Sequence, residues 1–305
     1  MANENENFDI FSMSVDDLDI NEKRSDGSDL YKPKPDQGSD GVYKSLIRFL
    51  PNPNNPRKPI INKYVYWLED TEGNGFYADS PTTIGEKCPV QDAFFKLRNS
   101  DSAIDNEMSE KLKRKANYYA LVQIIQDKQN PDLEGQIKVY KFGYKIKTKI
   151  DEELNPEFEE PTQVFDPFNG KNFQLIISKK GGFPNYDNCK FQSDKTAMVI
   201  NGEPVEATAE GKKAILEYLE GAPDLTNFEF KPWTDDIRSK INDLLKTFIS
   251  PGSSIESLTK TSKEAEPVRS EKVEEAETAI EESQPETEVT DNGDDLDEFL
   301  EGLDL

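Results

Sequence analysis

The stretch KLKRKANYYALVQIIQDKQNPDLEGQIKVYKFGYKIKTKI spans residues 111–150, and the rest of the chain is organised around it. It holds ten Lys/Arg and three Asp/Glu, although the whole chain of 305 residues carries a net charge of -24. Aromatic residues are interspersed with these cations: Tyr118, Tyr119, Tyr140, Phe142 and Tyr144. Cations beside flat rings suit a single nucleic-acid strand of almost any sequence, because phosphates attract the cations and bases stack on the rings.

Two strands and a turn are predicted inside this stretch. Residues 118–126 form the strongest strand pattern in the chain, NPDLEG predicts a turn, and residues 136–142 pair back. Helical turns are expected to follow through GYKIKTKIDEEL. The two strands therefore present the basic and aromatic residues on one ribbon.

Alternation along these strands decides which rings share a face. Lys138, Tyr140 and Phe142 fall on one face of their strand. Only one of Tyr118 and Tyr119 can face the same side, unless a bulge intervenes. This face is expected to be a stacking surface; the alternative is that Phe142 and one of the two tyrosines are ordinary barrel core.

Short strands and small helices make up the rest of the core. Strands are predicted at 43–50, 60–68, 76–78 and 173–180, and helices at 88–100, 101–115, 211–220 and from Pro232 onward. The segment GGFPNYDNCKF reads as an irregular loop. The fold class expected is mainly β with α (α+β): an OB-type Greek-key barrel core with an inserted lobe at about residues 70–112 and flanking helices.

The negative charge lies at the two ends of the chain. Residues 1–40 hold 11 acids and 4 bases, and residues 251–305 hold 18 acids and 4 bases, which leaves 32 acids and 29 bases in residues 41–250. We therefore expect a largely disordered acidic arm at 1–40, a folded core at 41–250 and a disordered acidic tail at 251–305. The acidic total does not exclude nucleic-acid binding, because binding follows local patches.

Both ends also carry short apolar segments. In residues 8–20 apolar side chains alternate with acids, and this segment either packs loosely or docks on a neighbouring molecule. The tail ends in DDLDEFLEGLDL, where four apolar residues share one helical face and are expected to bind partner proteins: Leu296, Phe299, Leu300 and Leu303. The alternative is a solvated tail that only aids solubility.

Several classes of protein are disfavoured. The chain has no His and two cysteines, Cys88 and Cys189, which suits a reducing compartment without a disulfide framework. Nucleotide-binding and metalloprotease motifs are absent. No apolar run approaches the ~18 to 20 residues needed to span a bilayer, so the protein is expected to be soluble and intracellular. No catalytic or metal-ligating constellation is apparent.

Four sequence pieces, in their order and spacing, carry a family resemblance. They are IRFLP at 47–51, KRK followed by YY within 113–119, NPDLEG leading into VYKFGYKI, and DPFNGKNF followed by GFPNYDNCKF. With the acidic ending, they make the chain similar to the single-stranded DNA-binding, or helix-destabilising, proteins of T-even-type bacteriophages. The resemblance covers about residues 43–250 and the acidic C-terminus.

The resemblance implies an OB-type core that coats single-stranded DNA cooperatively during replication, recombination and repair. It implies self-association along DNA, an acidic tail that recruits replication and recombination proteins, and action in the cytoplasm of the infected bacterial host. It also implies DNA contacts at nine residues: Lys113, Arg114, Lys115, Tyr118, Tyr119, Tyr140, Phe142, Phe183 and Tyr186. To these the basic pattern of the strands and their flanks adds Arg48, Lys138, Lys141 and Lys145.

Two departures from the family pattern are expected to matter. The family's zinc subdomain uses one His and three Cys, but here Cys88 remains alone, with Gln91, Lys63 and Asp79 at or near the other places. We therefore expect no zinc cofactor, because a tetrahedral site needs four N or S ligands. The family's basic N-terminal motif, which supports cooperative filaments, has a counterpart here only in Lys23-Arg24-Ser25. Cooperative binding to DNA is therefore expected to be weaker, or to use the apolar arm.

Two other functions remain open from the residues alone. One is a nuclease whose acids hold Mg²⁺, although no acid pair stands beside an obvious nucleophile. The other is an RNA-binding regulator or RNA chaperone, because stacking and phosphate contacts serve RNA as well as DNA.

Overall fold

A computed structural model describes residues 29–35 and 41–248, in which one large mixed sheet is combined with five α-helices. The strands of this sheet are β1 (Leu30–Tyr31), β2 (Tyr43–Phe49), β3 (Ile60–Glu69), β4 (Gly75–Asp79), β5 (Lys115–Asp127), β6 (Ile137–Phe142), β7 (Gly170–Lys180), β8 (Phe183–Asn185) and β9 (Lys190–Thr196). The helices are α1 (Pro89–Arg98), α2 (Ala103–Glu110), α3 (Tyr144–Leu154), α4 (Ala209–Glu220) and α5 (Asp235–Phe248). The α+β class is confirmed.

Smaller elements complete the described chain. A separate two-stranded sheet pairs β10 (Val199–Ile200) with β11 (Glu203–Pro204). Single 3-10 turns occur at η4 (Pro81–Ile84), η5 (Pro131–Leu133) and η6 (Leu225–Phe228).

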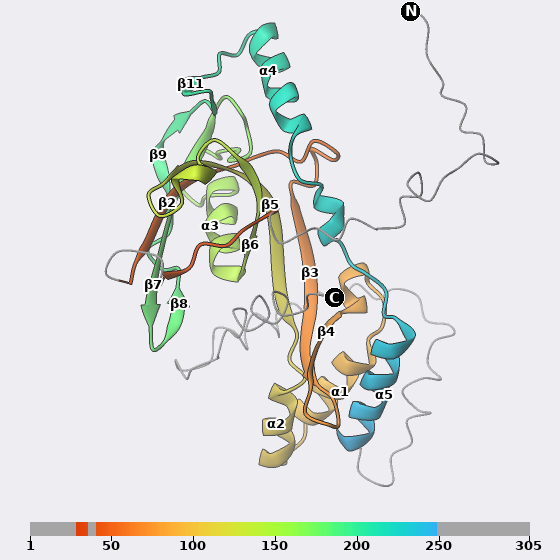
Figure 1. The fold of residues 1–305 in the computed structure, drawn as a ribbon. Helices are drawn as coiled ribbons and strands as arrows, with labels where there is room; N and C mark the ends of the chain where they lie inside the picture. Colours follow the sequence, from red (N-terminus) through yellow and green to blue (C-terminus); the bar gives the residue numbers. More distant parts are fainter. Residues whose placement is uncertain (1–28, 36–40, 249–305) are drawn as a thin grey trace, which may run out of the picture.

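Strand β5 is the centre of the sheet (Figure 1). One of its edges pairs first with β3, over residues 115–120, and then with β2, over residues 122–127. Its other edge pairs with β6 over residues 118–123. Strand β2 continues the sheet to β7, which in turn pairs with β8 and β9. Among the described residues no strand pair closes this sheet into a barrel.

The two faces of the sheet are covered by different elements. On one face, α3 contributes Ile146 and Ile150 to a core with β2, β5, β6, β7 and β9. On the other face, α4 contributes Ile215 and Leu219 to a second core. Both helices have apolar residues at i and i+4, which place them on one side of a helix.

The inserted lobe is larger than the sequence indicated. Its core joins the distal halves of β3 and β4 to α1, Leu112 and the C-terminal helix α5, so it extends beyond residues 70–112. Figure 1 shows α1, α2 and α5 gathered around the β3–β4 hairpin, at the end of the molecule away from α4. Helix α5 belongs to this lobe because Ile241, Leu244 and Leu245 form its buried stripe.

Most predicted elements are confirmed, with shifts at their ends. The predicted helix at 101–115 ends at Glu110 instead, since buried Leu112 turns into the lobe core and Lys115 already pairs in β5. The GGFPNYDNCKF segment is not irregular: Gly181 and Gly182 have φ of 63° and 93°. Two such residues make a tight hairpin turn, and β8 returns along β7.

Residues 29–35 correct the boundary of the N-terminal arm. They were assigned to a largely disordered segment, but Leu30 and Tyr31 form β1, which pairs in parallel with β6. The correction has a physical reason: buried Tyr31 joins the main core, although polar residues surround it in sequence. The structure does not describe residues 1–28, 36–40 and 249–305. The rest of the predicted N-terminal arm and the predicted acidic tail, including Leu296, Phe299, Leu300 and Leu303, therefore lie outside the described residues.

Candidate nucleic-acid interface

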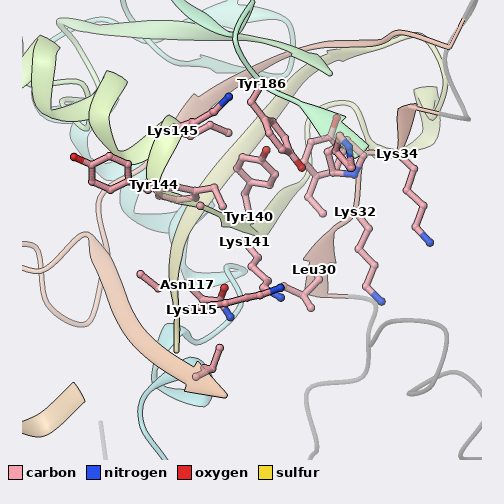
Figure 2. A pocket seen from close by; sticks show the side chains of 18 of the residues that line it. Leu30, Lys32, Lys34, Lys115, Asn117, Tyr140, Lys141, Tyr144, Lys145 and Tyr186 are labelled. Atoms are coloured by element: carbon pink, nitrogen blue, oxygen red, sulfur yellow. The ribbon is translucent and has the colours of Figure 1, made fainter. Parts of the chain in front are cut away.

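A pocket of about 400 Å³ opens where the sheet, the β3–β4 hairpin and the start of α3 meet (Figure 2). Its lining includes five lysines and seven aromatic residues, and no acidic residue among the residues that the structure describes. The lysines are Lys32, Lys34, Lys115, Lys141 and Lys145, and the aromatic residues are Tyr31, Trp67, Tyr77, Tyr140, Phe142, Tyr144 and Tyr186. In a chain of net charge -24, this composition marks a local site for an anion with flat groups.

A row of buried rings runs beneath the pocket. Tyr31 is paired with Tyr140 across β1 and β6, with ring centroids 6.0 Å apart. Tyr140 stacks on Phe142 at 5.8 Å, and Phe142 stacks on Tyr118, its partner in β5, at 5.8 Å. All four rings are at least nine-tenths buried. The strand alternation is therefore confirmed, with Tyr118 on the Tyr140 side, but these rings form a floor and are covered in this structure.

More exposed rings stand around this floor. Trp67 and Tyr77 pair across β3 and β4 and line the pocket. The indole of Trp67 lies over Gly75, where an added Cβ would come within 2.3 Å of Trp67 Cζ2, so only glycine admits this ring position. Tyr144, 49% exposed at the start of α3, and partly buried Tyr186 after β8 complete the set. These four rings are the more exposed aromatic groups of the pocket lining.

Three predicted cations line the pocket: Lys115, Lys141 and Lys145. Lys145 Nζ lies 2.7 Å from Asp187 Oδ1 in an exposed ion pair. The hydrogen bond from Lys145 holds the pKa of Asp187 below its usual value. Such a pair contributes about 0 to 1 kcal/mol, so a phosphate can replace Asp187 as the partner of Lys145 at little cost.

Other predicted residues lie elsewhere. Lys113, Arg114, Lys138 and Phe183 do not line the pocket. The guanidinium of Arg114 stacks over Tyr64 at 3.9 Å and donates to Thr82, which ties the entry to β5 against η4.

Tyr119 faces the opposite side of β5 from Tyr118. It stacks on Phe228 with centroids 5.1 Å apart, within the core that α4 covers. The strand alternation requires this separation. Tyr119 thus lies outside the pocket.

Arg48 is a clear correction. It was predicted to contact DNA, but its side chain is fully buried. It donates to Asn172 Oδ1, Thr196 Oγ1 and the carbonyl of Asp166 at 3.2, 3.1 and 2.7 Å. Burial lowers the pKa of Arg48 to about 10. Its role is to join β2 to β7 and β9, and no strand of nucleic acid can reach it in this structure.

Sequence reasoning missed half of the lysines and aromatic residues that line the pocket. Lys32 and Lys34 belong to the segment expected to be a disordered arm, and Trp67 was not predicted as a contact. The signal for the lysines was available in KPKP, which follows an apolar-aromatic pair at Leu30 and Tyr31. For Trp67 the signal was its alternation with buried Tyr66 and Leu68 on β3, which directs it away from the lobe core.

The positions that the family resemblance relates to zinc have other partners. Lys63 Nζ lies 3.2 Å from Asp79 Oδ2, and both side chains are more than nine-tenths buried. The hydroxyl of Tyr66 donates to Gln91 Oε1 at 3.1 Å and lies 3.5 Å from Cys88 Sγ. Burial raises the pKa of Tyr66, so this hydroxyl keeps its proton. An ammonium group and one thiol do not fit a tetrahedral zinc site, which needs four N or S ligands.

Metal-binding clusters and membrane-spanning helices are both absent from the part of the chain that the structure describes. No three or more His, Cys, Asp or Glu side chains gather there in a way that could hold a metal ion. No described helix is both long enough and apolar enough to cross a membrane.

The comparisons with known proteins agree with this composition. Residues 41–232 match the family model described as "gp32 DNA binding protein like". The proteins named "Single-stranded DNA-binding protein" from Enterobacteria phage T4 and Enterobacteria phage T2 are each 26% identical to the chain over 241 residues, which cover 77% of this chain and 76% of theirs. The matched segment contains every pocket residue except those of residues 30–34. The chain therefore belongs to the gp32 DNA-binding-protein-like family, whose members are binding proteins and not enzymes.

Proposed function

We propose that this protein binds and coats single-stranded DNA without sequence specificity. The observation that carries the proposal is the pocket lining, in which the described residues supply five lysines, seven aromatic residues and no acid. The lysines attract the phosphates of any strand, and the rings accept any base because every base has a π-face. The names of the two phage relatives support the same ligand.

The finer fold that we propose is an OB-type core. Strands β2, β5, β6, β7 and β9 pair in the order 6-5-2-7-9, and α3 joins β6 to β7. An OB-fold is a partly open five-stranded Greek-key barrel that binds oligonucleotides on its second and third strands and two adjoining loops. Counted in chain order among these five, β5 and β6 are the second and third strands. The β3–β4 insertion and the β8 segment are the two connections, and all of them line the pocket.

In this proposal the lysines and the rings have separate tasks. Lys115, Lys141 and Lys145 bind phosphates, and Trp67 and Tyr144 stack on bases. Stacking contributes about 1 to 3 kcal/mol per base, and each phosphate contact adds about -0.7 to the log-log slope of affinity against salt. These three lysines in contact give a slope of about -2.1.

The biological setting is part of the same proposal. Coating of single strands serves replication, recombination and repair of phage DNA in the cytoplasm of the infected host. The acidic tail at 251–305, with its four terminal apolar residues, recruits replication and recombination proteins, and neighbouring molecules associate along the DNA. The support for these roles is the charge and apolar pattern of the two ends together with the family membership.

We also propose that the lobe keeps its fold without zinc. The buried Lys63–Asp79 pair joins β3 to β4, and Asp79 Oδ2 also accepts the backbone N–H of Lys231 at 2.9 Å. Trp233 Nε1 donates to the carbonyl of Asp79, which fastens the entry to α5. These bonds link the segments that a metal would otherwise have to hold. Elemental analysis should find substoichiometric zinc, and one zinc per chain would overturn this proposal.

A titration with labelled oligomers tests the proposed function. Fluorescence anisotropy should give saturable binding of a mixed-sequence single-stranded DNA, with weaker binding to the matched duplex. The variant Lys115→Ala/Lys141→Ala should reduce the salt slope by about 1.4, in line with two lost phosphate contacts. Tighter binding of the matched RNA oligomer would favour an RNA-binding protein instead, and absence of binding to both would refute the proposal.

A further inference from the structure

The segment Leu30-Tyr31-Lys32-Pro33-Lys34-Pro35, called the strap below, has a conformation that its sequence dictates. Proline has no N–H to donate and fixes its own φ near -65°, so pairing with β6 ends at Tyr31, just before Lys32-Pro33. A residue before proline is restricted to extended conformations. Lys32 and Lys34 both precede prolines, so each lysine is held in extended backbone before any ligand arrives.

Tyr31 fastens one end of the strap to the core. Its ring is 3% exposed and packs against Tyr140, the floor of the pocket. Its hydroxyl donates to Asp127 Oδ2 at 2.7 Å, and Tyr43 donates to the same oxygen at 2.5 Å. Asp127 ends the central strand β5. The position of the strap is therefore set by buried contacts with the centre of the sheet.

The two lysines of the strap extend along the pocket. Both line it, together with Leu30 and Pro33. Figure 2 shows Lys32 and Lys34 on one side of Tyr140 and Tyr186, and Tyr144 at the start of α3 on the other side. In the same view, Lys115 and Lys141 lie between the two strap lysines and Tyr144. The strap thus completes a basic rim around the floor of rings.

We infer that the strap is a DNA-binding element of its own, in which Tyr31 positions Lys32 and Lys34 against consecutive phosphates of the bound strand. This inference rests on the proposed function and adds two contacts to it. It gives residues 29–35 a direct part in the site, although they lie before the segment that the family model matches.

A purely structural role explains only part of the strap. Strand β1 covers the edge of β6, and an uncovered edge invites pairing with other chains. Leu30 and Tyr31 are sufficient for that cover, because they make both register pairs. Two partly buried lysines that line this pocket are not needed to seal an edge. Their position on the pocket lining suits a phosphate ligand.

The test uses the full chain and two matched double variants. Lys32→Gln/Lys34→Gln removes two charges from the strap and keeps polar side chains of similar length. Lys212→Gln/Lys213→Gln removes two charges from exposed positions on α4, outside the pocket. The measurement is the affinity for a single-stranded oligo-dT across a range of salt concentrations.

The strap variant should lose about 1.4 from the salt slope, at about 0.7 per contact, whereas the α4 variant should keep the slope of the wild type. If affinities converge near 1 M salt, this change means roughly 25-fold weaker binding at 0.1 M. Lys32→Arg/Lys34→Arg should restore the slope, because charge and reach are kept. Equal melting temperatures for all variants should accompany these results.

The outcomes separate the inference from the proposed function. A steep wild-type slope that the strap variant shares would overturn the strap as a binding element and leave the proposed function intact. A lowered melting temperature with an unchanged slope would also overturn it, in favour of a structural role. A flat wild-type profile would overturn both.

Discussion

Gly75→Ala is the substitution with the most sharply defined effect on the pocket. The new Cβ would lie 2.3 Å from Trp67 Cζ2 and 3.0 Å from Cε2 and Cη2, whereas ordinary contacts begin at 3.4 Å. The indole must therefore move by about 1 Å or more. Strand β4 has less freedom to yield, because it is paired with β3 over five residues and carries buried Ala78 and Asp79.

The size of the effect follows from the role of Trp67. If this ring stacks on a base, losing the contact costs about 1 to 3 kcal/mol. At about 1.4 kcal/mol per tenfold, the dissociation constant for single-stranded DNA should rise by roughly 5-fold to 150-fold. Trp67→Ala should give a loss of the same size. The two changes combined should cost no more than either one, because both remove the same contact.

Tryptophan fluorescence follows the ring directly. The chain has two tryptophans, so the assay is made in a Trp233→Phe background, where Trp67 is the sole tryptophan. Oligo-dT should quench Trp67 in the reference protein and quench it less after Gly75→Ala. Gly221→Ala is the matched control, because its new Cβ would lie 3.8 Å from the carbonyl oxygen of Tyr218, an ordinary contact. An altered emission spectrum of Trp67 with unchanged DNA affinity would refute a stacking role for this ring.

Three further predictions concern other parts of the molecule. Asp187→Asn removes the acid beside Lys145 and should tighten DNA binding several-fold at low salt, where screening is weakest, and much less at high salt. Weaker DNA binding by this variant would show instead that Asp187 positions Lys145. Lys63→Met leaves Asp79 buried without its cation and should cost about 3 to 5 kcal/mol of unfolding free energy. Adding Asp79→Asn should recover most of this loss, and chelator treatment should leave the melting temperatures unchanged. Additive losses of the two substitutions in urea unfolding would contradict the ion-pair account. Burial raises the pKa of Cys189 to about 11, so its thiol stays protonated and buried at pH 8. The thiol should therefore react with a thiol reagent only after unfolding, which peptide mass mapping measures. Fast labelling of Cys189 in the native protein would contradict this prediction.

Local patterns allowed much of the fold to be predicted. The period-two alternation of β5 and β6 correctly separated Tyr118 from Tyr119, because pairing in a sheet preserves that alternation over its whole length. Helix α3 was expected from GYKIKTKIDEEL and runs from Tyr144 to Leu154. These features depend on residues close together in sequence.

The missed features depend on distant contacts. Strand β1 has only two residues, and its partner β6 lies more than 100 residues further along the chain. A strand of this length shows no alternation of apolar and polar residues from which it could be predicted. Arg48 looks like a surface cation in sequence, yet the groups that surround it lie between residues 166 and 196. The family resemblance, in contrast, was confirmed by the family model, since it rested on motifs spread over the whole core.

The division between floor and rim rings also needed three dimensions. Tyr140 and Phe142 were expected to stack on bases, and both lie in the pocket, but neighbouring rings cover them. The more exposed rings are Trp67, Tyr77, Tyr144 and Tyr186, of which only Tyr186 was predicted as a DNA contact. Exposure depends on how β3, β4 and α3 meet, which no single segment encodes.

Photocross-linking tests the central claim most directly. An oligo-dT that carries 5-iodouracil is bound to the full chain, irradiated and mapped by mass spectrometry. The pocket account predicts cross-links concentrated at Trp67, Tyr77, Tyr144 and Tyr186, which decrease when unlabelled single-stranded DNA competes. Cross-links that instead concentrate on α4 or on the outer face of α5, with these four rings unmodified, would show that the strand binds elsewhere and would contradict the account.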